Sequence, residues 1–138
     1  MFTLEQIHAA HSRTKSGAEY PQYVAELKAL GVLRYTHFVA DGHTEFQGSE
    51  GLPISSAASP TIRVIAREGD AAGFRTQLVA NQKGATSFAE FCSDCARTGV
   101  ATWVADFASM TCTYYLLNGT VVLVEEISEP AKGSLYSK

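Results

Sequence analysis

Three cysteines and two histidines are the residues whose types could most directly perform chemistry in this sequence. Cys92 and Cys95 form a C-x-x-C pair, and Cys112 follows in a later segment. Because zinc takes four thiolate, imidazole or carboxylate ligands, His37 or His43 would have to complete a site. The zinc alternative therefore uses Cys92, Cys95, Cys112 and His43, and a redox pair of Cys92 with Cys95 is a further alternative.

Core packing is the simpler interpretation of the same thiols, and we favour it. Phe88, Phe91, Cys92 and Cys95 fall on one face of a predicted helix, where apolar groups are needed. Free cysteine is among the most buried residue types and packs as a small hydrophobic side chain. A redox pair would place one thiol at the helix N-terminus, whereas Cys92 lies a turn inside. We therefore expect no cofactor, with zinc as the alternative.

Four of the five binding candidates lie on the last three predicted strands. Trp103 and Asp106 fall on opposite faces of one strand, so we expect a core tryptophan and a strand-end turn residue. Strand alternation places Tyr114 and Glu125 on the core face of the following hairpin. Glu125 either reaches the rim of the core or lines a cavity, where burial would raise its pKa. The predicted ligand-binding residues are Trp103, Asp106, Tyr114, Glu125 and His43.

The turn of that hairpin also predicts its register. Asn118-Gly119 is typical of a two-residue turn, which would pair Cys112 with Glu125 and Tyr115 with Val122.

No catalytic motif stands out among the remaining polar residues. His8 and His11 share a predicted helix face but lack the H-E-x-x-H pattern of zinc enzymes, and no G-x-S-x-G elbow is present. His37 lies on a predicted strand and His43 at a hairpin tip, so surface or hydrogen-bonded histidines are expected. The sequence favours a protein that is not an enzyme, but catalytic groups can also converge in space without a motif.

Composition limits the class of protein. The chain has 138 residues with 46% hydrophobic content, which fits one packed domain over residues 1–130, with 131–138 as a flexible tail. Its net charge of −3 argues against nucleic-acid binding, and no apolar run is long enough to cross a membrane. With three cysteines and no signal peptide at the N-terminus, we expect a cytoplasmic protein.

Hydrophobic periodicity and capping residues predict the elements. Capping boxes at Thr3/Gln6 and Ser87/Glu90 predict the start of the first and fourth helices. Gly31 and Gly99 predict the end of the second and fourth helices. The predicted helices cover residues 4–13, 20–30, 70–82 and 87–98. The predicted strands cover 32–40, 44–47, 62–66, 100–107, 111–117 and 120–127. The fold class is α+β: an antiparallel sheet with about four helices packed on one face.

The second half of the chain resembles the first. An offset of 68 residues aligns Tyr20 with Phe88 and Gly31 with Gly99, and the same order of elements follows. One hypothesis is an internal duplication of a helix–helix–strand–hairpin unit, with repeat halves 1–50 and 68–128. The alternative is that any helix entering a strand through a glycine cap produces this pattern.

Several segments resemble a known bacterial family. They include Phe38-Val39-Ala40-Asp41-Gly42-His43-Thr44, Phe91-Cys92-Ser93-Asp94-Cys95-Ala96 and Met110-Thr111-Cys112-Thr113-Tyr114-Tyr115. The chain resembles the YdfO-like family of uncharacterised small proteins, some of which lie in prophages and are called "phage envelope protein". Leu116-Leu117 departs from the tyrosine-rich turn of these relatives. The resemblance implies no activity, cofactor or catalytic residue.

Two function classes follow from these observations. The first is a non-enzymatic cytoplasmic module that binds a protein partner or small ligand, as a monomer or homodimer. Its support is a surplus of aromatic residues in the hairpins, namely Tyr35, Phe46, Tyr114 and Tyr115, which would form an exposed patch. The second is a metal-binding protein or enzyme that uses Cys92, Cys95, Cys112 and His43.

Overall fold

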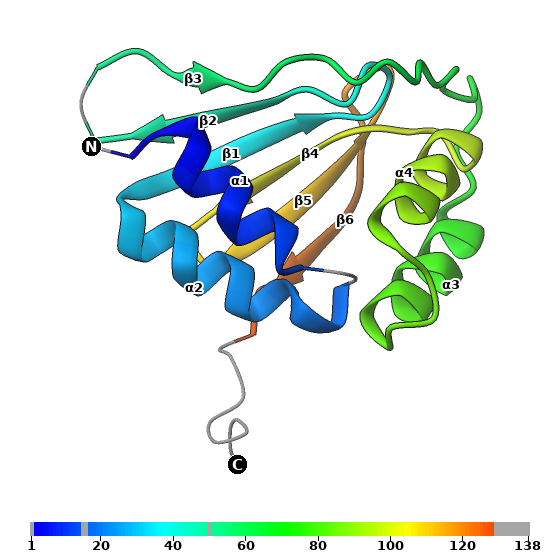
Figure 1. Ribbon diagram of the computed structural model, residues 1–138. Helices are drawn as coiled ribbons and strands as arrows, with labels where there is room; N and C mark the ends of the chain where they lie inside the picture. The colour runs from blue at the N-terminus through cyan, green and yellow to red at the C-terminus, as the bar shows by residue number, and fades with distance from the viewer. Residues whose placement is uncertain (1, 15–16, 50, 129–138) are drawn as a thin grey trace.

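The computed structural model describes residues 2–14, 17–49 and 51–128, and it shows one sheet with all four helices on one face (Figure 1). The helices form two pairs: α1 and α2 lie together, and α3 and α4 lie together on the other side of the face (Figure 1). This arrangement confirms the predicted α+β class. The sheet is antiparallel throughout, in the order β3-β2-β1-β4-β5-β6.

Local capping interactions explain where the helices begin and end. The helices are α1 (Leu4–Ser12), the 3-10 helix η1 (Gly17–Glu19), α2 (Tyr20–Leu30), α3 (Ala71–Gln82) and α4 (Phe88–Arg97). Both predicted capping boxes are present, Thr3 with Gln6 and Ser87 with Glu90, and each satisfies backbone N–H groups of the first turn. Gly31 ends α2 in the left-handed conformation at φ 101°.

The strands are short and mostly follow the predicted ranges. They are β1 (Val32–Phe38), β2 (Thr44–Gly48), β3 (Ile54–Ser55), β4 (Val100–Asp106), β5 (Thr111–Leu116) and β6 (Val121–Glu126). The predicted strand at 62–66 was wrong: that segment is extended but not a strand, and Val64 is 89% exposed. The sequence prediction missed β3, which pairs with β2 instead.

The two halves of the sheet share one register. Thr36 pairs with Glu45 in the first hairpin, and Val104 with Thr113 in the second, so both pairs keep the offset of 68 residues. At the centre of the sheet Thr36 pairs with Val104 itself, which puts the two halves antiparallel to each other. This symmetry is what a duplication would produce, and the duplication stays a hypothesis.

The last hairpin shows where the predicted register fails. Cys112 pairs with Glu125 as predicted, but Tyr115 pairs with Val121 and not Val122. The cause is the turn: Leu116 N–H donates to Thr120 O, which closes a longer turn than a two-residue loop. The register shifts by one residue between Tyr114 and Tyr115 to accommodate it.

The core lies between the sheet and the helix pairs. Among its most deeply buried side chains are Ile7, Val24, Leu27, Phe74, Val100 and Cys95. Within the described residues, no helix has the length and apolar character needed to span a membrane.

Candidate functional site

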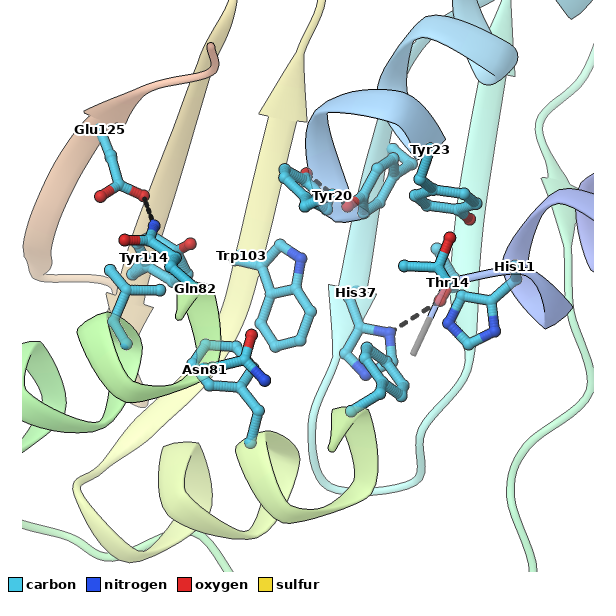
Figure 2. Close-up of a pocket in the computed structure, with 15 residues that line it drawn as sticks. His11, Thr14, Tyr20, Tyr23, His37, Asn81, Gln82, Trp103, Tyr114 and Glu125 are labelled. Atoms are coloured by element: carbon cyan, nitrogen blue, oxygen red, sulfur yellow. Dashed lines mark hydrogen bonds between the residues drawn. The ribbon is translucent and has the colours of Figure 1, made fainter. Parts of the chain in front are cut away.

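A pocket lies over the centre of the sheet, lined by residues from both helix pairs. Its volume is about 100 Å³, and its lining comes from α1, α2, α3, α4 and five strands. The aromatic lining residues are Tyr20, Tyr23, Tyr35, Phe88, Phe91, Trp103 and Tyr114, with His11 and His37 beside them. The other lining residues are Thr14, Thr44, Leu78, Asn81, Gln82 and Glu125. Figure 2 shows Trp103 in the middle of this group.

Trp103 on β4 is the central ring of the pocket. The His37 ring stacks on it at 4.4 Å between centroids, and Phe91 and Tyr114 lie at 5.5 and 6.2 Å. The Trp103 side chain acts to lower the pKa of the buried Tyr35 hydroxyl, against the larger effect of burial. Trp103 is 5% exposed and is the only tryptophan in the chain.

His37, on β1, packs against α4 and is held in its neutral form. Its Nδ1 lies 2.8 Å from Thr44 Oγ1, and its Nε2 lies 3.8 Å from Cys92 Sγ. Burial, with smaller contributions from the nearby charges of His11, His43 and Arg63, lowers the pKa of His37 to about 4. Burial also raises the pKa of Cys92 to about 12. The pair therefore stays a thiol and a neutral imidazole, which is not the thiolate–imidazolium state of a cysteine nucleophile.

Tyrosine hydroxyls and one carboxylate provide polar groups around the rings. The Tyr20 and Tyr35 hydroxyls share a hydrogen bond of 2.6 Å, and burial raises the pKa of both well above the ordinary value. Glu125 is half-buried and accepts a hydrogen bond of 2.8 Å from the exposed Gln82 amide (Figure 2). This pair marks the rim of the pocket. No lysine or arginine is among the lining residues that the structure describes.

The structure brings together three of the five predicted ligand-binding residues. Trp103, Tyr114 and Glu125 line the pocket, whereas Asp106 and His43 do not. The Asp106 carboxylate accepts from the N–H groups of Ala108 and Ser109, so it organises the turn after β4.

His43 has local partners at the first hairpin. Its Nδ1 lies 2.6 Å from Asp41 Oδ1, and its ring stacks on Phe38 at 4.2 Å. The hydrogen bonds from His43 lower the pKa of Asp41.

The predicted zinc ligands are not brought together. Cys92, Cys95 and Cys112 are free thiols, each no more than 2% exposed. In the part of the chain that the structure describes, no group of three or more histidine, cysteine or acidic side chains is placed to hold a metal ion. The alternative set of Cys92, Cys95, Cys112 and His43 was therefore wrong as a cluster. The thiols pack in the core: Cys92 and Cys95 lie on the buried face of α4, and Cys112 is buried on β5.

The expected exposed aromatic patch was also wrong. Tyr35, Phe46 and Tyr114 are each 5% exposed or less, and Tyr115 is half-buried. Two of these rings, Tyr35 and Tyr114, instead line the concave pocket.

Several residues of the site were missed by sequence reasoning. His37 was expected to be a surface or hydrogen-bonded histidine, and Asn81 and Tyr23 were not singled out. Asn81 had one usable signal: it is a polar residue at a core position of α3, in register with the buried Phe74 and Leu78. For His37, strand alternation with the buried Tyr35 and Val39 gave the same signal.

We expect all three cysteines to react slowly with iodoacetamide in the folded protein. Burial raises the pKa of Cys92 and Cys112 to about 12, so the thiolate is scarce, and labelling at pH 8 should be more than about 100-fold slower than for free cysteine. Mass spectrometry of native and unfolded samples measures this rate. Ala89→Cys, at an exposed position of the same helix, is the reactive control. Rapid native labelling of one of the three would contradict the packing described here.

The fold and site define a class: a small α+β protein with an aromatic pocket between two helix pairs, whose described lining contains no lysine or arginine. The chain belongs to the family described as "Protein of unknown function (DUF1398)", which matches residues 8–126. It is similar to the "Uncharacterized protein Mb2035" of Mycobacterium bovis, at 29% identity over 118 residues, covering 83% of this chain and 71% of the relative. The "Uncharacterized protein Rv2012" of Mycobacterium tuberculosis matches to the same extent.

Proposed function

We propose that this protein binds a small uncharged molecule with an aromatic ring in the pocket around Trp103, and that it does so without catalysis. The observation that carries this proposal is the lining of the pocket: seven aromatic rings and two neutralised or half-buried histidines converge from all four helices and the sheet. Binding sites for small molecules are concave, mostly apolar and furnished with a few polar groups, and this pocket has those properties.

The electrostatics of the pocket favour an uncharged ligand. An anion would need a compensating cation, and the described lining has no lysine or arginine. The carboxylate that could meet a cation, Glu125, is at the rim and already accepts from Gln82. His37 also loses its own charge in this environment, which supports a neutral occupant.

The state of the thiol beside the pocket supports binding and not catalysis. Cys92 does not line the cavity, and its pKa of about 12 keeps it a thiol at neutral pH. To act as a general base, His37 would have to accept a proton from a substrate. Its lowered pKa makes the ring a weak proton acceptor at neutral pH.

Two sequence-based interpretations belong to the same proposal. We infer a cytoplasmic location from the three cysteines, which are buried free thiols and form no disulfide. We also infer that the family includes the YdfO-like proteins, because the segments around Cys92 and Cys112 resemble theirs; these segments lie in α4 and β5.

A thermal-shift and calorimetric screen tests the proposal. A panel of single-ring compounds in three charge classes (phenol and toluene, benzoate, benzylammonium) would be titrated into the wild-type protein. We expect the neutral compounds to bind and both ions to bind at least about tenfold more weakly, because a buried charge here lacks a partner.

A blocking variant shows where the compounds bind. Thr14→Phe adds a ring at a half-buried lining position and should abolish binding. Val79→Phe adds the same ring on the exposed side of α3 and should leave binding unchanged. If no class binds, or if Thr14→Phe binds as the wild type does, the proposed function is wrong.

A further inference from the structure

Asn81 has a buried amide whose orientation is fixed by its neighbours. The side chain is 6% exposed, in the last turn of α3. Its Nδ2 donates to Thr86 O at 3.0 Å, Thr86 Oγ1 at 3.2 Å and Ser87 O at 3.4 Å. Backbone carbonyl oxygens only accept hydrogen bonds, so the amide nitrogen must face the α3–α4 connection. The amide oxygen therefore has to face the other way.

The Asn81 oxygen faces the pocket without a donor. Figure 2 shows it directed toward Trp103, and Asn81 is among the lining residues. Among the residues that the structure describes, none donates a hydrogen bond to this oxygen. Buried polar groups in proteins are nearly always hydrogen-bonded, so an acceptor left open in a cavity marks the position of a ligand donor.

The opposite wall offers a second open polar group. Tyr23 on α2 is 6% exposed and lines the pocket. The contacts described for its ring are those with His11 and Tyr20, and no hydrogen bond of its hydroxyl is found within residues 2–14, 17–49 and 51–128. In Figure 2 Tyr23 and Asn81 lie on opposite sides of Trp103 and His37. A ligand between them would meet a polar group at each end.

We infer that the ligand is an uncharged six-membered aromatic ring bearing an O–H or N–H donor, which hydrogen-bonds to Asn81 Oδ1 while the ring packs against Trp103. This inference rests on the proposed function and adds the ligand class and the residue that selects it. The volume sets an upper limit of one ring: the pocket holds about 100 Å³, less than the roughly 150 Å³ of an apolar cavity that accommodates benzene, so part of the ring would reach the rim. Larger ligands of this class would extend past Glu125 and Gln82 at the rim.

Phenol and toluene make a matched pair of probes. They have the same ring and nearly the same size, but phenol donates a hydrogen bond and toluene cannot. Toluene in the pocket would leave the Asn81 oxygen without a donor and shielded from solvent, which is costly. Calorimetry on the wild-type protein should therefore show phenol binding about tenfold more tightly than toluene.

Two variants assign that preference to the Asn81 oxygen. Asn81→Leu removes the acceptor, so the ratio of phenol to toluene affinity should fall to about one or below. Thr86→Val removes one partner of the Asn81 nitrogen and leaves the oxygen in place, so the ratio should stay near the wild-type value. Circular dichroism checks that each variant is folded, and the wild-type comparison stands by itself if Asn81→Leu unfolds.

The outcomes separate the two proposals. If phenol and toluene both bind in the pocket with equal affinity, the inference about Asn81 is wrong and the proposed function stands. If Asn81→Leu keeps the preference for phenol, a different group selects the donor and the inference is likewise overturned. If neither probe binds the wild type, both proposals fail together.

Discussion

Replacing Gly99 by alanine is expected to cost about 4 kcal/mol of unfolding free energy, whereas the same change at Gly31 should cost about 1 kcal/mol. Both glycines have positive φ, 91° and 101°, and they occupy corresponding positions 68 residues apart. An alanine Cβ at residue 99 would lie 2.9 Å from Glu68 O and 3.0 Å from Gly69 Cα. Nothing lies within 4 Å of a Cβ at residue 31.

The two variants are each other's control. Both place an alanine in the left-handed conformation, but only Gly99→Ala adds a clash with backbone atoms. Urea denaturation followed by Trp103 fluorescence measures both losses on one scale. Equal losses would show that the segment before α3 does not press against Gly99 in solution. Equal losses would also mean that Gly31 and Gly99 have equivalent surroundings in the two halves of the chain.

Acidification should destabilise the protein through His37. Its pKa in the folded protein is about 4, below the ordinary value of 6.5, so the folded state favours the neutral ring. The stability that the neutral His37 ring contributes is fully present above pH 6.5. It falls as the pH drops from 6.5 toward 4 and is lost below pH 4. The difference of about 2.5 pKa units corresponds to about 3 kcal/mol. Burial also lowers the pKa of the nearby His11, which adds to the loss in the same direction.

Unfolding free energies from about pH 7 to about pH 4 test this effect. His37→Gln should be less stable than the wild type at pH 7, because packing against Trp103 is lost, but it should lose less stability on acidification. Val24→Ala truncates a buried side chain without removing a titratable group, so it should lower stability at every pH but keep the full wild-type dependence on pH. If His37→Gln and the wild type lose stability in parallel, the neutral buried state of His37 is wrong.

Much of the fold could be predicted because its determinants are local in sequence. The capping boxes at Thr3 and Ser87 act over three residues, and Gly31 ends α2 through its own backbone conformation. The Asn118-Gly119 turn signal predicted the Cys112–Glu125 pair, which the structure shows although the loop is longer than predicted. These features need no knowledge of what packs above them.

Two predictions failed for different reasons: one segment lacks a partner strand distant in sequence, and one turn closes differently from what its local residues indicate. Residues 62–66 have the β-branched composition of a strand, but Val64 faces solvent and no ladder forms there. The turn after Leu116 adopts a longer loop than Asn118-Gly119 suggests, because backbone hydrogen bonding to Thr120 closes it.

Only one wall of the pocket could be predicted from the sequence, because the other wall depends on how the helices pack over the sheet. Trp103, Tyr114 and Glu125 share one sheet face, and strand alternation reveals that. The opposing wall comes from all four helices, and no pattern in the chain shows which polar residue of those helices faces the pocket. Asn81 and Tyr23 could be found only once the helices were placed over the sheet.

The resonance of the Trp103 indole N–H tests the pocket most directly, since the chain has one tryptophan and therefore one such signal. In a titration of ¹⁵N-labelled protein with phenol, we expect this signal to shift saturably, and to stay fixed in Thr14→Phe at the same phenol concentrations. An indole signal that does not move while backbone signals elsewhere do would place the binding site outside the pocket and contradict the account.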